Sequence, residues 1–542
     1  MESDFLPFLS LVMTQLMTAI QQDVTAGDDV DPEELEARSD LHMVEMETGW
    51  VAVRTAAVEE QSSACQLVML MVEKLQEHFY PNVEATVNAI APLLDSPHED
   101  VRSFCMVAIP ELVRSTAKAT SPDRTALINL TEYFVGLLVK SIESESSLEL
   151  IMTGLQALRA TFSYACTDWT RHTRGMREPA KITPTTSIRF LNVSQMEAIT
   201  QCATLVLRDS LQRRAILRAE AQVSGGGVDE DDVGDEEMFQ QNCMELHFNL
   251  AELIGTVFKT HGSDFMVVYR QIWHETVVQM VHVNCLKEDR QFGYFIISDV
   301  IEFGLTTETA GDYFATIMAN VMEGCQSEEE GIRQTSVYCI GIAAELYPSI
   351  FLPFAASSLT ALSGAIAMGD GEEARGMSTD NAVSSVGILL EQMQLVIGDT
   401  SNALTASFPF VWSEWLAYLP LRDDVEEGAR VLRQLAKLLR NKHAVLFSSL
   451  ESVEQAVLVL VEVLGTDLVG PEVTREVVHT LQLMRVGDSS LLGKGGMEQL
   501  CAKLDPERGE KLKQYLSMDF SSPLESSSPQ APAPIHDVLM RF

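Results

Sequence analysis

The sequence predicts an all-α protein in which helix pairs stack into a solenoid, and three observations predict it. Apolar residues recur every three or four positions along most of the chain, which is the period of an amphipathic helix. Sustained alternation of β-branched and polar residues, the signal of a strand, is nearly absent. One helical pattern also returns at intervals in the forties, which is typical of HEAT repeats. We therefore expect a HEAT-repeat α-solenoid, a right-handed superhelix of antiparallel helix pairs.

The clearest copy of the pattern is His98–Val113, which reads HEDVRSFCMVAIPELV. Its apolar residues fall mainly on one helical face. Asp100 lies at the start, where a carboxylate suits the free amide hydrogens and the dipole of a helix N-terminus. Pro110 removes one helical hydrogen bond, and we expect it to bend the helix so that stacked repeats curve.

Three other segments repeat this pattern: Glu288–Phe303, Glu329–Ala344 and Thr379–Gln392. The position of Arg102 is taken in turn by Arg290, Arg333 and Asn381, and the last two intervals are 43 and 48 residues. One helix pair cannot bury its own apolar face, so neighbouring repeats must supply the core. We also expect charged residues at the helix starts to pair between adjacent repeats.

The partner helices share a start in which an aromatic residue precedes a proline, whose missing amide hydrogen costs nothing there. Such starts occur at Phe5–Phe8, Tyr80–Leu94, Phe351–Phe354 and Phe408–Phe410. Together the two patterns predict helix pairs at 60–94, 97–142, 145–220, 238–285, 287–325, 328–368, 378–418 and 421–465, with a weaker pair near 470–517.

The predicted organisation follows from these pairs and their interruptions. It consists of a partial repeat at 1–22, an acidic linker at 23–57, HEAT repeats at 58–220 with a basic insertion at 167–191, an acidic flexible loop at 221–237, HEAT repeats at 238–517 and a disordered tail at 518–542. Runs of acids and Ser/Pro-rich stretches cannot bury enough apolar surface to pack as repeats.

The composition describes a large apolar array with an acidic surface. Hydrophobic residues make up 46% of the 542 residues, and the formal net charge is −40. Such a charge repels nucleic acid and anionic lipid and attracts basic proteins, although it also simply keeps an apolar array soluble. The amino terminus is acidic where a targeting peptide would be basic, and no apolar run is long enough to span a bilayer. We expect a soluble, intracellular protein that binds neither nucleic acid nor membrane.

No sequence pattern indicates a catalytic centre, a cofactor or a metal. Leu491–Met497 has a lysine among glycines but lacks the spacing of a phosphate-binding loop. The segment Trp273-His274-Glu275 lacks the second histidine that a zinc peptidase places four residues on. The nine cysteines form no CxxC pair. We predict that the protein is not an enzyme.

An aromatic and acidic segment, Phe408–Glu427, offers a candidate binding surface. Trp412 and Trp415 lie three residues apart with Glu414 between them. Two interpretations stay open: the tryptophans belong to the solenoid core, or one is exposed. An exposed tryptophan beside carboxylates would hold the stem of a lysine or arginine while an acid meets its charged head.

Four segments resemble the carboxy-terminal half of the importin-β (karyopherin-β) family, most closely its importin beta-three type: Val58–Glu84, Asp289–Glu302, Thr379–Gln392 and Trp415–Gly428. The likeness covers most of residues 41–515. It implies a superhelix that carries cargo through nuclear pores and shuttles between cytoplasm and nucleus. The expected partners are basic cargo segments, including nuclear-localisation signals of ribosomal proteins or histones, phenylalanine-glycine (FG) nucleoporins, and the GTPase Ran.

The likeness has two departures. The amino-terminal half of the family, which holds the principal Ran site, has no counterpart here, so the chain is either a fragment of a longer product or a shortened receptor. The basic insertion at 167–191 also has no counterpart in the family. We expect a monomer in which Ran binding is possible but lacks its main site.

The resemblance implies electrostatic capture of basic segments without catalysis. Many weak charge contacts along an extended segment would supply the affinity. The candidate cargo contacts are Asn381, as an amide that binds backbone, and Trp412, Glu414, Trp415, Asp423, Asp424, Asp229, Glu230, Asp231, Asp232, Asp235, Glu236 and Glu237.

Two alternatives remain. A HEAT scaffold or adaptor for a multiprotein assembly would share the fold without the transport role, and it would bind a folded partner tightly and independently of salt. An enzyme embedded in a helical array would need a compact αβ segment, and the sequence offers none.

Overall fold

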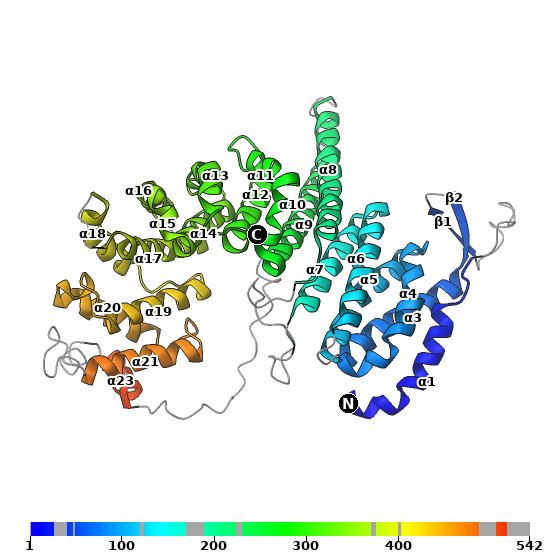
Figure 1. Cartoon of the computed structure of the whole chain (residues 1–542), viewed down its shortest axis with the longest axis horizontal. Helices are drawn as coiled ribbons and strands as arrows, with labels where there is room; N and C mark the ends of the chain where they lie inside the picture. The colour runs from blue at the N-terminus through cyan, green and yellow to red at the C-terminus, as the bar shows by residue number, and fades with distance from the viewer. Residues whose placement is uncertain are drawn as a thin grey trace. The chain divides into compact units, whose positions relative to one another are not determined.

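The computed structural model describes residues 2–25, 41–46, 49–119, 124–167, 169, 189–223, 230–369, 376–398, 403–486, 504 and 506–517. The chain divides into two compact units, Met1–Phe354 and Ala355–Phe542. Each unit is a stack of helix pairs arranged in two layers, which is the predicted HEAT-repeat α-solenoid (Figure 1).

In unit 1, one layer contains the repeated helix of the sequence pattern. Its members are α3 (Thr55–Leu75), α5 (Glu99–Ala119), α7 (Leu148–Cys166), α9 (Glu230–His261), α12 (Lys287–Asp299) and α14 (Glu330–Leu346). Each helix of this layer packs directly against the next, whereas helices of the other layer touch one another less. Because closer packing marks the inner side of a curved stack, we name this the inner layer.

The outer layer of unit 1 holds the partner helices. They are α1 (Glu2–Ile20), α4 (Val83–Ile90), α6 (Thr125–Ser144), α8 (Val193–Val223), α10 (Met266–Ile272), α11 (His274–Met280), α13 (Ala310–Gly324) and α15 (Pro348–Phe351). Short helical turns connect the layers at η1 (Gln76–Asn82), η2 (Ala91–Asp95), η4 (Gly262–Asp264), η5 (Val300–Gly304) and η6 (Leu352–Phe354).

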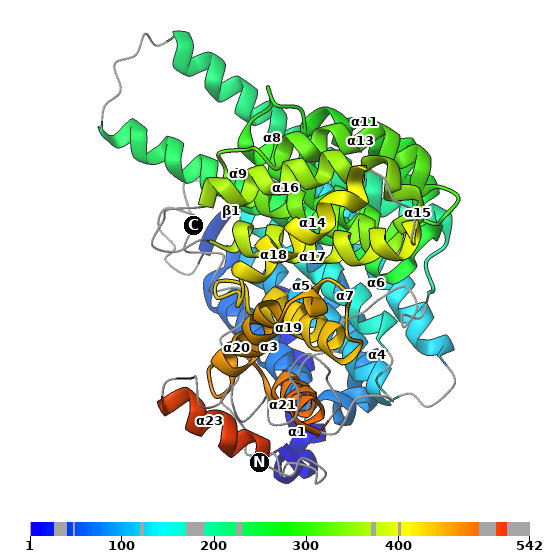
Figure 2. The same cartoon turned by 90° about the vertical axis from the view of Figure 1, so that its left-hand side faces the viewer.

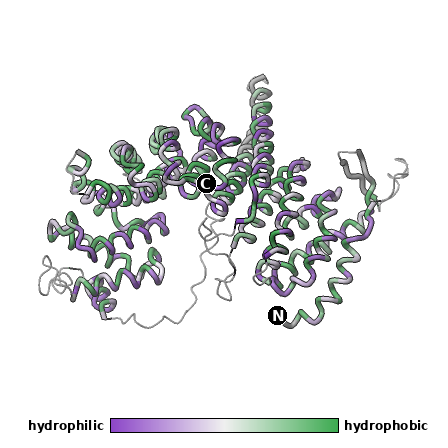
Figure 3. Tube along the Cα trace, in the orientation of Figure 1, coloured by the Kyte–Doolittle hydropathy of each residue, from purple (hydrophilic) through white to green (hydrophobic). Residues whose placement is uncertain are grey.

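Unit 2 repeats the two-layer plan. Its inner layer is α17 (Met377–Ile397), α19 (Val425–Arg440) and α21 (Pro471–Val486), and its outer layer is α16 (Ala355–Gly369), α18 (Ala403–Ala417) and α20 (Leu450–Val463). The turn η7 (Leu446–Ser448) precedes α20, and α23 (Pro506–Ser517) packs against α20 and α21. Apolar and polar residues alternate along the helices of both units (Figure 3).

A small hairpin lies within the segment predicted as an acidic linker at 23–57. Strands β1 (Leu41–Met46) and β2 (Gly49–Arg54) pair antiparallel, with Leu41 opposite Arg54. Val53 of β2 packs with Val24 and Val58 in a local core beside α3. The strand pattern is only six residues long on each side, too short to stand out from the surrounding acidic sequence.

The described parts of the segment predicted as an acidic flexible loop at 221–237 are helical. Helix α8 continues to Val223, and α9 begins at Glu230, so the described acids 230–237 occupy the first turns of α9. Figure 2 shows both helices extending past their neighbours in unit 1. Acidic residues favour a helix N-terminus because they oppose its positive dipole end, which explains why an acidic run here begins a helix.

Within the part of the chain that the structure describes, two helices are long and apolar enough, by length and composition alone, to span a bilayer: Thr125–Ser144 and Pro348–Gly369. The first is α6, an outer-layer helix of unit 1 that packs against α7 and α8. The basic insertion lies mainly, and the tail wholly, outside the described residues.

Candidate functional site

The two predicted contact tryptophans are core residues. Trp412 and Trp415 are 0% and 2% exposed, and their rings meet edge to face at 5.1 Å. Trp415 Nε1 donates to the carbonyl of Val383 at 3.0 Å, and Gly387 leaves room for its ring, since a Cβ there would lie 2.7 Å from Nε1. The interpretation of an exposed aromatic surface is therefore wrong for both residues, because they supply the apolar volume between α17 and α18.

Asn381 is also used inside the fold. Its Nδ2 donates to the carbonyl of Met377 at 2.9 Å and to Asp424 Oδ2 at 2.7 Å. Asp424 in turn caps α19 by accepting from the Glu427 backbone N–H at 3.0 Å. Both amide hydrogens of Asn381 thus have partners within the chain, and the side chain is buried. Its role here is to join neighbouring repeats.

Asp380, beside Asn381, organises the same loop. The backbone N–H groups of Arg422, Asp423 and Asp424 donate to Asp380 Oδ2 at 3.0, 2.7 and 2.9 Å. Burial raises the pKa of Asp380, and these three hydrogen bonds oppose that rise. No sequence signal distinguished Asp380, because its partners are backbone groups.

Two of the predicted acids in unit 2 are exposed. Glu414 lies on the solvent side of α18, and Asp423 is exposed although its Oδ2 accepts from the Gly376 N–H at 3.0 Å. Residues 230–237 lie in α9, and Asp229 lies outside the described residues. The predicted contacts are therefore divided between the two units, with 230–237 in unit 1 and the others that the structure describes in unit 2.

Charge pairs join helices of different repeats, as predicted, among the described residues. Arg102 binds Glu145 through Nε and Nη2 at 2.9 and 3.2 Å, and Arg214 binds both oxygens of Asp289 at 2.8 and 2.7 Å. Further pairs join adjacent repeats: Arg159 with Glu252, Lys437 with Glu391 and Arg440 with Glu476. Arg290 pairs with Glu323 of α13 within one helix pair. These cations thus help to hold neighbouring helices of the stack together.

The aligned arginines also make equivalent contacts. Arg102 Nη1 donates to the carbonyls of Ser96 and Pro97 at 2.8 and 3.3 Å. Arg333 Nη1 donates to the carbonyls of Ser327 and Glu328 at 2.8 and 2.7 Å. Each arginine closes the turn before its helix, so the gapless alignment of the two segments reflects equivalent structure.

A buried acidic cluster on α9 and α12 escaped the sequence analysis. Lys259 Nζ lies 3.5 Å from Asp299 Oδ1, and Gly255 lets α9 approach this carboxylate, since a Cβ would lie 2.1 Å from Oδ2. Burial raises the pKa of Asp299 to about 6 against the attraction of Lys259, and Glu252 adds to the rise. Burial alone would lower the pKa of Lys259, but Asp299 and Glu252 hold it above its ordinary value.

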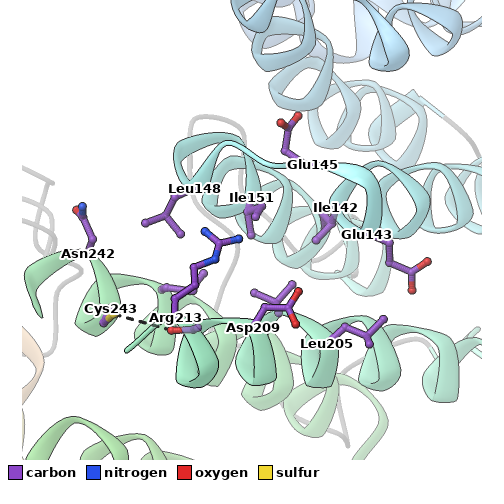
Figure 4. Close-up of a pocket in the computed structure, with 13 residues that line it drawn as sticks. Ile142, Glu143, Glu145, Leu148, Ile151, Leu205, Asp209, Arg213, Asn242 and Cys243 are labelled. Carbon is purple, nitrogen blue, oxygen red and sulfur yellow. Dashed lines mark hydrogen bonds between the residues drawn. The ribbon is translucent and has the colours of Figure 1, made fainter. Parts of the chain in front are cut away.

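A cleft opens between α6, the start of α7, α8 and α9 in unit 1 (Figure 4). Apolar side chains line it: Ile142, Leu148, Ile151, Leu205, Val206 and Leu246. Glu143, Asp209 and Arg213 also line it and supply charge.

A serine, a histidine and an aspartate lie next to one another in space, in that order, beside this cleft. Ser210 Oγ is 3.4 Å from His247 Nε2, and His247 Nδ1 is 3.9 Å from Asp289 Oδ1. Arg214 occupies both oxygens of Asp289, and burial lowers the pKa of His247 to about 4. This histidine is therefore a poor general base, and the trio lacks the close base-to-orienter hydrogen bond of a nucleophilic triad. Within the described ranges, no group of three or more His, Cys, Asp or Glu side chains could hold a metal ion.

The chain is similar in sequence to curated import receptors. It is 22% identical over 477 residues to a probable importin-5 homolog of Dictyostelium discoideum, covering 86% of this chain and 40% of that protein. It is 22% identical over 447 residues to importin subunit beta-3 of Saccharomyces cerevisiae, covering 81% of this chain and 37% of that protein. The chain thus spans about two fifths of the length of these relatives. No family model matches it.

Solved structures share the fold. The chain matches Kap121p bound to Nup53p with a TM-score of 0.68 and 18% identity, over 94% of this chain and 42% of that one. It matches Kap121p bound to RanGTP with a TM-score of 0.67 and 20% identity, over 94% and 42%. These likenesses support the HEAT-repeat architecture of nearly the whole chain.

Proposed function

We propose that the chain belongs to the importin-β family and is the cargo-binding part of a nuclear import receptor. The observation that carries this proposal is the joint likeness in sequence to importin-5 and importin beta-3 across more than four fifths of the chain. A receptor of this kind shuttles between cytoplasm and nucleus through the nuclear pore. It binds and releases partners without making or breaking bonds.

Charge supports basic segments as cargo. The chain has 78 acidic residues against 38 Lys and Arg, so 40 carboxylates would stay uncompensated even if every cation were paired. Several of these cations are already engaged by acids of neighbouring helices. The remaining acids attract lysine- and arginine-rich segments, speed encounter and support several simultaneous contacts. Glu414, Asp423 and the acids of α9 remain candidates for such contacts.

The cleft of Figure 4 supports a second partner class. Its apolar lining suits the phenylalanine of an FG nucleoporin repeat, and Kap121p has been solved bound to the nucleoporin Nup53p. Kap121p has also been solved with RanGTP, and we propose that Ran is a further possible partner of this chain.

Binding of the whole chain to three immobilised peptides tests the proposal. We expect retention by a lysine- and arginine-rich localisation peptide and by FG repeats, but not by a matched peptide in which serine replaces phenylalanine. Retention by the basic peptide should fall steeply as salt rises. If the chain binds neither the basic peptide nor the FG repeats but binds a folded partner at high salt, it would instead be a scaffold or adaptor.

A further inference from the structure

The first two inner-layer helices expose apolar side chains that the core does not use. Leu67 and Leu70 on α3 are 47% and 39% exposed, and Val107 on α5 is 40% exposed. The residues that pack α3 into the core lie on the opposite side of the helix, at positions 58, 61, 64, 65, 68, 72 and 75. Neighbouring exposed apolar residues of this size on a helix surface indicate a contact surface.

Contacts between α3 and α5 fix their relative level. Ser115 Oγ donates to the carbonyl of Gln76 at 2.7 Å, and Arg114 Nη2 donates to the carbonyl of Glu73 at 3.1 Å. These partners are 39 and 41 residues apart. Residues about 40 apart therefore lie level on the two parallel helices, which places Leu67 level with Val107.

The same spacing places two acids level with each other. Glu60 lies seven residues before Leu67, and Asp100 lies seven residues before Val107. Both acids are exposed. Neither is held in a tight ion pair: Glu60 accepts from Gln22 at 3.5 Å, and Asp100 lies 3.9 Å from His98. The short side chains of Ser63 and Ser103 occupy the positions between.

At the other end of α3 and α5, the lysine and arginine side chains already have partners within the chain. Lys74 pairs with Glu73, and Arg114 pairs with Glu111. Lys118 Nζ lies 4.5 Å from the ring centroid of Trp169 and donates to Gln76. Net negative charge therefore gathers at the helix starts, and we name the surface formed by Glu60, Ser63, Leu67, Leu70, Asp100, Ser103 and Val107 the apolar–acidic strip.

We propose that the apolar–acidic strip binds an extended peptide segment in which a bulky apolar residue lies about three positions from a lysine or arginine. Seven residues of helix separate the acids from the apolar pair by about 10 Å. An extended peptide covers that distance in about three residues, at roughly 3.3 Å each. The apolar side chain buries the exposed surface of Leu67, Leu70 and Val107, and the cation meets Glu60 and Asp100. This inference rests on the proposed function. It names a cargo class, segments that combine an apolar residue with a cation, to which purely basic segments do not belong.

Titration of the full chain with three fluorescent peptides of equal charge tests the strip. The first carries a leucine three positions from a lysine pair, the second replaces that leucine with serine, and the third places the leucine directly beside the lysines. We expect the first peptide to bind about tenfold more tightly than the other two, because only it buries the apolar group while keeping the charge contact.

The double variant Leu67→Gln/Val107→Gln should lose that preference while keeping the weaker binding of the serine peptide. Both side chains are exposed, so the melting temperature should not change. The matched control is Val267→Gln, an exposed apolar residue of α10 in the outer layer, which should keep the preference.

Equal binding of all three peptides, or an equal loss of the preference in the control variant, would overturn the proposal for the strip. It would not affect the proposal that the chain is part of an import receptor. Binding of none of them would overturn both proposals. A concentration-dependent dimer that Leu67→Gln/Val107→Gln abolishes would assign the strip to a second copy of the chain and would also overturn the inference.

Discussion

Asp380 illustrates how single side chains set the joints between repeats. One of its oxygens accepts three backbone N–H groups of the loop that leads into α19, and the adjacent Asn381 holds the cap of that helix. A carboxylate can satisfy several converging donors that no neutral side chain of similar size satisfies as well.

Replacing Asp380 with alanine should lower the unfolding free energy of unit 2 by about 2–4 kcal/mol, because three backbone N–H groups lose their shared acceptor. Chemical denaturation measures the loss, and hydrogen exchange should localise it to residues 422–424. Glu414→Ala on the solvent side of α18 is the control and should change stability by less than about 0.5 kcal/mol. Equal effects of the two changes would contradict the role of Asp380.

Asp299 gives the stability a pH dependence with a definite sign. Its pKa in the folded chain is about 6 because of burial, above the ordinary value of 3.8. Between these values the folded chain binds more protons than the unfolded chain, so this group makes stability fall as pH rises from 4 to 6 and level off above.

Asp299→Asn should remove that contribution. The stability difference between variant and wild type should change by about 1–3 kcal/mol from pH 4 to pH 6, in favour of the variant at the higher pH. Urea denaturation at four pH values in this window measures it. A constant difference across the window would show that Asp299 titrates as an ordinary carboxyl.

Sequence patterns could not assign individual side chains reliably. An aromatic pair beside acids is compatible with a core position and with a binding surface. The contacts of Trp415 with Val383 and Gly387 place it in the core. Asp380 and Asp299 were missed because their partners are backbone groups or residues about forty positions away. Partners that distant leave no local signal in one sequence.

At the scale of helices, ion pairs between repeats complement the apolar contacts. Arg102 and Glu145 are mostly buried, and Arg102 also closes its own turn. Lys140 and Asp95 also join neighbouring elements, at 3.2 Å, but are 69% and 64% exposed. The two pairs differ chiefly in burial, which makes them a matched comparison.

A double-mutant cycle for Arg102→Ala and Glu145→Ala should give a coupling free energy of about 1–3 kcal/mol, and the cycle for Lys140→Ala and Asp95→Ala should give less than about 0.5 kcal/mol. Thermal unfolding of the four single and two double variants measures both. A ranking in the reverse order would mean that burial does not strengthen these inter-repeat pairs.

The repeated helix and its partner were predictable because their period and their proline starts are local features. Element boundaries near acidic segments were not. The acids of 230–237 indicated a loop by composition, yet they occupy the first turns of α9, where the helix dipole favours them. The hairpin at 41–54 was missed because two six-residue strands give a weak alternation signal.

For the whole molecule, the fold followed from the repeat period, and the proposed partner class rests on charge. A solenoid needs only contacts between neighbours, so a periodic apolar stripe specifies it without long-range information. An excess of 40 negative charges favours a basic partner but does not indicate the place where it would bind. That place depends on which acids remain after the inter-repeat pairs form, and only the structure shows this.

The measurement that tests the account most directly is the affinity of the full chain for a basic localisation peptide as a function of salt. We predict micromolar or tighter binding at 50 mM NaCl that weakens at least tenfold by 300 mM, with no binding of a charge-reversed peptide. Affinity that stays constant across this range, or equal binding of the acidic peptide, would contradict the claim that an acidic helical stack captures basic cargo.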